Sequence, residues 1–223
     1  MSACRSLFRM AVLAVTLGAT AALAQAPDVG LVNMLNGEVS YTSEGTAVAK
    51  AQPFMKMRQG DRFSVPAGAQ LRIVYFQGGR QETWKGPANF KAGATSSDAQ
   101  SGAPSEVSTL PAAVPQKIAQ VPELLQIAKL GRSGGVSVRG AGRPPKLTAD
   151  QQAEVTSARD TYRKLRAQAV ADDITPELYL YSVLQDYLLY EDMKPVVDEM
   201  SKRQPNNTGV QELASWVKTR TQP

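Results

Sequence analysis

The chain holds few residues of the types that usually carry out catalysis. Among its 223 residues there is no histidine, and its one cysteine is Cys4. The commonest general base, the commonest metal ligand and the usual thiolate nucleophile are therefore missing. A Ser-Lys dyad or a carboxylate pair is the chemistry that remains, and the densest acid pairs are Asp172-Asp173 and Glu191-Asp192. We expect helices to begin at both pairs, where a capping role explains them. We predict that the protein is not an enzyme and uses no cofactor or metal.

The densest run of positive charge is the glycine-rich stretch 131–146, which contains no acidic residue. Its four basic residues are Arg132, Arg139, Arg143 and Lys146. Glycines let backbone amides approach an anion closely, so these four residues form a candidate anion-binding loop. Their spacing matches neither of the two common glycine-rich phosphate-binding patterns. A solvated basic linker is the alternative, and we favour it.

The first 26 residues have the pattern of a secretory signal peptide. Arg5 and Arg9 precede an apolar run of 15 residues, Met10–Ala24, and Ala22-Leu23-Ala24 and Ala24-Gln25-Ala26 are both small-x-small cleavage sites. The run is shorter than the roughly 20 residues that span a bilayer, so we expect cleavage and no membrane span afterwards. An exported chain without disulfides fits a bacterial periplasm. The mature chain is only mildly basic, and we predict no nucleic-acid partner.

Residues 27–93 are predicted to form a small all-β roll or sandwich. Asn36-Gly37 is a strong hairpin signal, and further glycine turns separate short runs of alternating apolar residues. In the strand around 71–76, Leu71, Ile73 and Tyr75 share one face, with Arg72, Val74 and Phe76 on the other. We expect Ile73→Asp to unfold this domain and Arg80→Ala to leave it folded.

This β-region resembles a FecR-type domain over about residues 30–93. The resemblance rests on Asn36-Gly37, Gly60-Asp61, Gly68-Ala69, the L-R-I-V-Y-F strand and Gly86-Pro87. It departs at Gln77-Gly78, where the family usually has Asp-Gly. The family is named for periplasmic regulators of ferric-citrate signalling. The resemblance therefore implies a β-fold and a periplasmic setting, and it assigns no site residue.

Residues 94–146 are predicted to be a linker. Its first part is rich in Ala, Ser, Gly and Pro and has few large apolar residues, which favours a mobile segment over 94–116. A short helix is expected over 117–131, and the basic glycine-rich loop follows it. Residues 147–223 are predicted to be helical, with Thr148 as an N-cap.

One part of the helical region, residues 174–207, resembles a single tetratricopeptide repeat. Its length of 34 residues fits the period of that family, and Pro205-Asn206-Asn207 is similar to its ending. On this resemblance the peptide-binding face would consist of Leu178, Ser182, Gln185 and Asp186. A generic helical hairpin explains the same residues nearly as well, since only one clear copy is present and a solenoid needs about three.

The predicted fold is therefore multidomain, with a β-roll or sandwich, a linker and a C-terminal helical hairpin or tetratricopeptide-like bundle. The predicted function is a non-catalytic periplasmic interaction or adaptor module whose partners are envelope proteins, with a possible link to signalling. The alternative is binding of peptidoglycan or another anionic glycan through basic residues of the β-domain, among them Arg58, Arg62, Arg72, Arg80 and Lys85.

Overall fold

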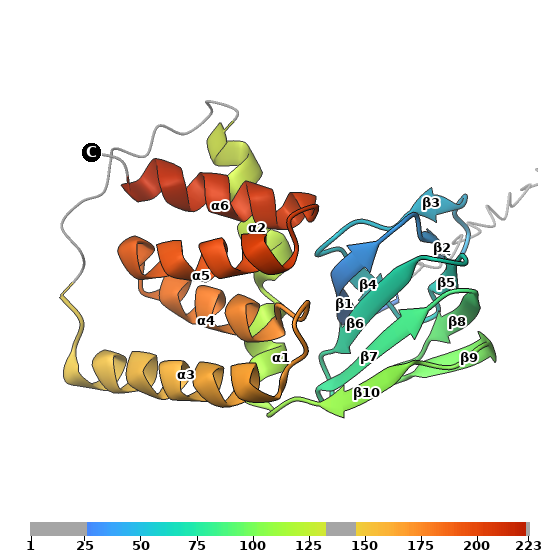
Figure 1. Cartoon of the computed structure of the whole chain (residues 1–223), viewed down its shortest axis with the longest axis horizontal. Coiled ribbons are helices and arrows are strands. Elements are labelled where there is room, and N and C mark those ends of the chain that lie inside the picture. The colour runs from blue at the N-terminus through green and yellow to red at the C-terminus, as the bar shows by residue number, and fades with distance from the viewer. Residues whose placement is uncertain (1–25, 133–145, 222–223) are drawn as a thin grey trace, which may run out of the picture.

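The structure is a computed structural model that describes residues 26–132 and 146–221. It consists of a β-sandwich of two antiparallel sheets followed by a helical domain, which confirms the predicted fold class (Figure 1). The first sheet contains, in spatial order, β10 (Glu106–Thr109), β7 (Arg80–Lys85), β6 (Gln70–Tyr75), β1 (Asp28–Asn36) and β4 (Lys56–Arg58). The second sheet contains β3 (Ala49–Lys50), β2 (Ser40–Thr42), β5 (Arg62–Val65), β8 (Ala88–Ala92) and β9 (Ser97–Ser101).

Alternation along β6 separates two cores. Leu71, Ile73 and Tyr75 point between the sheets and join the sandwich core, as predicted. The same core contains Trp84 and Phe90, whose rings stack with centroids 4.4 Å apart. The intervening side chains of β6 point to the outer face of the first sheet, which the helical domain covers.

The Asn36-Gly37 turn does not join a hairpin. β1 belongs to the first sheet and β2 to the second, so the chain crosses between sheets at this turn. Gly37 has a φ of +80°, and a Cβ atom there would lie 3.0 Å from the Cβ atom of Ala69. The glycine is therefore needed for the turn, but the turn connects layers rather than paired strands.

The predicted linker is wrong over residues 97–109. This segment forms β9 and β10, which pair with β8 and β7 and so add one edge strand to each sheet. Both strands are largely exposed. Edge strands that bury little surface need no apolar alternation, and this explains why their composition looks like that of a linker.

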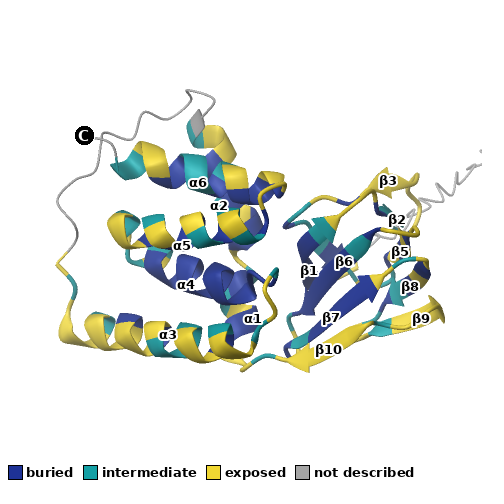
Figure 2. Ribbon diagram, viewed as in Figure 1, coloured by how far each residue is buried: buried dark blue, intermediate teal, exposed yellow. Residues whose placement is uncertain are grey.

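The helical domain is built around one buried helix. Its helices are α1 (Ala113–Ile118), α2 (Val121–Arg132), α3 (Ala149–Gln168), α4 (Thr175–Asp186), α5 (Tyr190–Arg203) and α6 (Thr208–Thr221). The first ten residues of α4 are all buried, and α1, α3 and α5 pack around it (Figure 2). Thr148 caps α3 in a capping box with Gln151, as predicted for this residue.

Candidate functional site

The outer face of the first sheet is polar where it meets the helical domain. Asn33 on β1, Arg72 on β6, and Gln81 and Thr83 on β7 are all buried there. We call the contact between this face and the helical domain the junction. Burying polar groups is costly unless each finds a partner, so the junction must supply hydrogen bonds.

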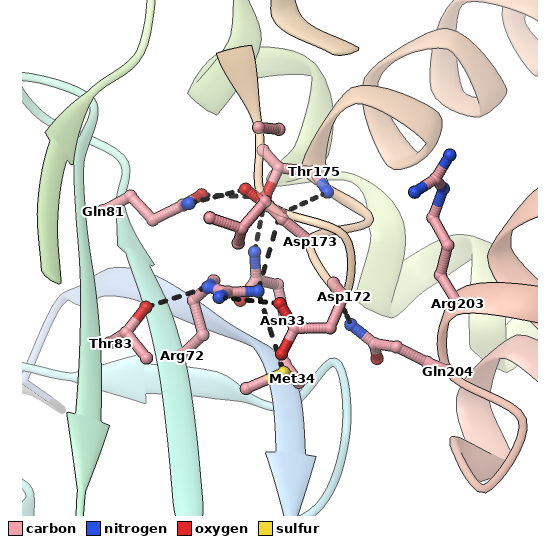
Figure 3. Close-up of polar contacts among 12 residues, drawn as sticks. Asn33, Met34, Arg72, Gln81, Thr83, Asp172, Asp173, Thr175, Arg203 and Gln204 are labelled. Atoms are coloured by element: carbon pink, nitrogen blue, oxygen red, sulfur yellow. Dashed lines mark hydrogen bonds and ion pairs between the residues drawn. The ribbon is translucent and has the colours of Figure 1, made fainter. Parts of the chain in front are cut away.

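Arg72 is the centre of the junction. Only 1% of its side chain is exposed, yet its guanidinium lies 3.1 Å from the carboxylate of Asp172 and 4.0 Å from that of Asp173. Its Nε donates a hydrogen bond to the hydroxyl of Thr83 at 2.9 Å. Figure 3 shows Arg72 reaching from the sheet into the loop between α3 and α4. A buried cation of this kind needs nearby counter-charges, and the helical domain supplies two of them.

Thr175 is the second polar link across the junction. Its hydroxyl accepts a hydrogen bond from the side-chain amide of Asn33 at 2.6 Å and lies within donating distance of Asp173 and Gln81. The Gln81 amide in turn donates to Asp173 at 2.7 Å, and Asp173 also accepts from the Thr175 backbone N–H. Both acids of the pair Asp172-Asp173 are thus used for domain docking, and Asp173 also accepts from the first backbone N–H of α4, whose N-cap residue is Ile174 (Figure 3).

A buried carboxylate inside the helical domain holds the loop that carries these acids. Glu177 is fully buried on α4 and lies 3.1 Å from Arg166 and 3.4 Å from Arg203. Burial raises the pKa of Glu177 above its ordinary value, against the opposing effect of the two arginines. Arg166 donates to the carbonyl oxygens of Ala169, Val170 and Asp173, and Arg203 donates to that of Ala171. These bonds fix the loop in the position that meets Arg72.

An apolar contact completes the junction. Phe54, from the β-domain, belongs to the same buried cluster as the helices, together with Leu31 and Val74. Its ring lies against Gly209 in the first turn of α6, where an added Cβ atom would come within 2.5 Å of it. The two domains therefore share one core as well as one polar network, and they dock directly on each other.

The predicted partner-binding residues do not form an open face. Leu178 and Ser182 are completely buried, and Gln185 is partly buried. Asp186 is 2.7 Å from Lys117 of α1, and although partial burial opposes it, Asp186 raises the pKa of Lys117. The physical reason is that α1, from the predicted linker, packs against α4 on this side. No local sequence pattern indicates this contact between distant segments.

Of the predicted anion-binding residues, Lys146 is exposed. Arg139, Arg143 and the side chain of Arg132 lie outside the described residues, as does nearly all of the predicted signal peptide. On the β-domain, Arg62 and Lys85 are exposed, whereas Arg72 is used inside the junction.

Arg80 is paired with a buried carboxylate inside the β-domain. It lies 2.5 Å from Glu82, which is 1% exposed between the two sheets. The expected tolerance of Arg80→Ala therefore needs revision, because that change would leave a buried carboxylate without its cation.

Ser215 and Lys218 on α6 form a Ser-x-x-Lys spacing. Lys218 is exposed. A lysine acts as a base when burial or a second cation destabilises its ammonium form, and an exposed position provides no such burial. The spacing does not by itself support catalysis.

An apolar depression of the helical domain lies between α3 and α5, above α4. We call it the α3–α5 groove, and its volume is about 410 Å³. Leu180, Leu184 and Val196 form its floor, with Pro195 exposed at its side. Arg159 and Arg163 stand on the α3 rim, and Asp192 and Glu199 on the α5 rim.

Comparison with known proteins finds no matching family model, no matching curated protein and no matching solved structure. The FecR-type and tetratricopeptide resemblances therefore stay predictions. Within residues 26–132 and 146–221, no helix is long and apolar enough to cross a membrane. The same residues contain no group of three or more His, Cys, Asp or Glu side chains placed to hold a metal ion.

Proposed function

We propose that this protein is a non-catalytic interaction module of the bacterial envelope, exported to the periplasm, whose helical domain binds an amphipathic helix of another protein. The observation that carries the proposal is the α3–α5 groove. Its volume of about 410 Å³ lies in the range of roughly 300–1,000 Å³ that is usual for ligand-binding clefts. The location is supported by the signal-peptide pattern of the first 26 residues.

The two rims of the groove carry opposite charges. Arg159 and Arg163 line the α3 side, whereas Asp192 and Glu199 line the α5 side. An amphipathic helix would place its apolar stripe on the floor, its acidic flank along α3 and its basic flank along α5. Charge complementarity thus predicts a partner helix with one acidic and one basic flank, and it determines which flank lies along α3.

One ion pair crosses the groove. Arg159 of α3 lies 2.8 Å from Asp192 of α5, and both side chains are about half exposed. Exposed ion pairs contribute roughly 0–1 kcal/mol, so a partner that offers its own charges can replace this contact at small cost. Arg163 pairs with Asp160 on its own helix, which leaves it on the α3 rim.

Site-specific photo-crosslinking in cells tests the proposal. A photoreactive residue at position 163 stands on the rim, and one at position 157 stands on the exposed side of α3 that is turned away from the groove by helical spacing. We expect position 163, and not position 157, to crosslink to a protein segment with helical apolar periodicity. A synthetic peptide of that segment should bind about fivefold or more weakly to Arg163→Glu, and an acidic-to-basic change in the peptide should restore binding.

Equal crosslinking from both positions would contradict the groove as the binding site. Capture of cell-wall material alone, released by salt, would support the glycan-binding alternative instead. Positions 157 and 163 are both exposed and lie on the same helix, so a difference in crosslinking between them is due to the groove.

A further inference from the structure

The four edge strands of the sandwich are not protected equally. β4 carries Lys56 and Arg58, and β3 has two residues, one of which is Lys50. Short length and lysine residues are common means of preventing an edge strand from pairing with another chain. β9, with the sequence Ser-Asp-Ala-Gln-Ser, and β10, with the sequence Glu-Val-Ser-Thr, contain no basic residue, and β10 is exposed at all four positions (Figure 2).

Backbone geometry shows which groups of β10 are open. Leu110 donates its N–H to the Gly79 carbonyl at 2.8 Å, and the ladder pairs Thr109 with Arg80 and Ser108 with Gln81. Because hydrogen bonding alternates along an antiparallel strand, the backbone of Ser108 also faces β7. The N–H and C=O groups of Val107 and Thr109 therefore face the open side, where they are placed to bond an added strand.

A cavity of about 90 Å³ lies beside this open edge, between β10 and the C-terminal end of α3. Glu106 and Ser108 line it from β10, and Leu165 and Ala169 line it from α3. In register, Glu106 and Ser108 stand opposite the junction residues Thr83 and Gln81, so their side chains share the face that looks toward the helices. Every second side chain of an added strand would point to the same side, toward the cavity.

The charge around the cavity is negative. Its lining contains Glu106 and Asp173 and no basic residue. The guanidinium of Arg72 lies within 4.0 Å of three carboxylates, those of Glu106, Asp172 and Asp173. The guanidinium of Arg166 donates to the backbone carbonyls of Ala169 and Asp173 and is already paired with Glu177. Because Arg72 is shared by three carboxylates, those that line the cavity are not fully balanced, which favours a further cation.

We propose that β10 binds an extended segment of another polypeptide as an added strand, and that a lysine or arginine of this segment enters the cavity between β10 and α3. Backbone hydrogen bonds at Val107 and Thr109 hold the segment, and the cavity selects the basic side chain. The site is separate from the α3–α5 groove and does not depend on it. Together, the two sites would make the protein a two-sided adaptor with a fixed distance between its partners.

Selection of displayed random short peptides on the full mature protein tests this inference. We expect selected peptides to share one lysine or arginine within an extended, proline-free stretch. A selected peptide should slow amide hydrogen exchange at Val107 and Thr109 in the wild-type protein. Val107→Pro removes the outward N–H without touching the bonds to β7, and it should weaken binding about tenfold or more, whereas Val107→Ala should change it by less than about threefold.

Glu106→Gln should reduce the preference for lysine over glutamine in the peptide. Failure to select any peptide, selection without a basic residue, or unchanged hydrogen exchange at Val107 and Thr109 would overturn the proposal. The exchange measurement uses the wild-type chain, so the test holds even where a proline variant unfolds. Arg163→Glu should leave this peptide affinity unchanged, which separates failure of this site from failure of the groove.

Discussion

The guanidinium of Arg72 lies 3.1 Å from the carboxylate of Asp172, a residue 100 positions further along the chain, although only 1% of the arginine side chain is exposed. This pair joins a strand of the sandwich to the loop before α4. Because the cation is buried, its stability depends on a partner that the other domain supplies. The helical domain is thus part of the environment that lets the β-domain fold with this sequence.

Replacing Arg72 with methionine tests the polar half of the junction. The change keeps much of the side-chain volume and leaves Asp173 buried without its nearby cation. Breaking a buried ion pair in this way costs about 3–5 kcal/mol of unfolding free energy. Chemical denaturation of the mature protein measures it. Arg62→Met is the control, because Arg62 is exposed on β5, and it should change stability by less than about 0.5 kcal/mol. Equal effects of the two changes would show that the junction contributes nothing.

Gly209→Ala tests the apolar half. A Cβ atom at this position would come within 2.5 Å of the Phe54 ring, so we expect a loss of about 1–3 kcal/mol, measured by chemical denaturation. Phe54→Leu replaces the ring that causes the overlap with a smaller side chain. In that background Gly209→Ala should cost little, because alanine is otherwise the better helix former. Additive costs in the double variant would mean that the two residues are not in contact.

Glu82, which lies inside the sandwich and away from the junction, should make the free energy of unfolding depend on pH. Burial alone would raise the pKa of Glu82, but hydrogen bonds from Arg80, Ser97 and Trp84 together hold it below its ordinary value of 4.5. A lowered folded-state pKa means that the stabilisation is present above pH 4.5 and is lost as the pH falls through the folded value. The stability difference between wild type and Glu82→Gln should therefore shrink on acidification below pH 4.5. A difference that stays constant between neutral and acidic pH would contradict this assignment.

Removing residues 147–223 should not release a well-behaved β-domain. The truncation exposes Leu31, Phe54 and Val74, which are buried in the core shared with the helices. It also leaves Arg72 without its partners Asp172 and Asp173. We expect aggregation of the truncated chain, measured by light scattering after purification. Adding Phe54→Ser and Arg72→Thr should improve its solubility. A soluble, monomeric truncated chain without these changes would argue against a shared core.

Local patterns were sufficient for much of the fold. The alternation of Leu71, Ile73 and Tyr75 correctly predicts the buried side of β6, and Thr148 correctly predicts the start of α3. Such features depend on neighbours in sequence. The strands β9 and β10 were missed because they are exposed edge strands, in which small polar residues carry no alternation.

The junction could not be predicted from local patterns, because its partners lie far apart in the chain. Arg72 reads as a surface cation on the outward side of a strand, and only its pairing with Asp172 shows that this side is covered. Its isolated charge between buried positions was the one available signal. The same limitation applies to Ser182, whose predicted binding face is closed by α1.

Unfolding of the two domains in one variant tests the shared junction most directly. The chain has two tryptophans, Trp84 in the sandwich core and Trp216 in the helical core. In Trp216→Phe, fluorescence reports the β-domain through Trp84, while far-ultraviolet circular dichroism reports mainly the helices. If the junction makes the two domains unfold as one unit, both signals should change at the same denaturant concentration. Two separate transitions would show that the domains fold independently and would contradict the account.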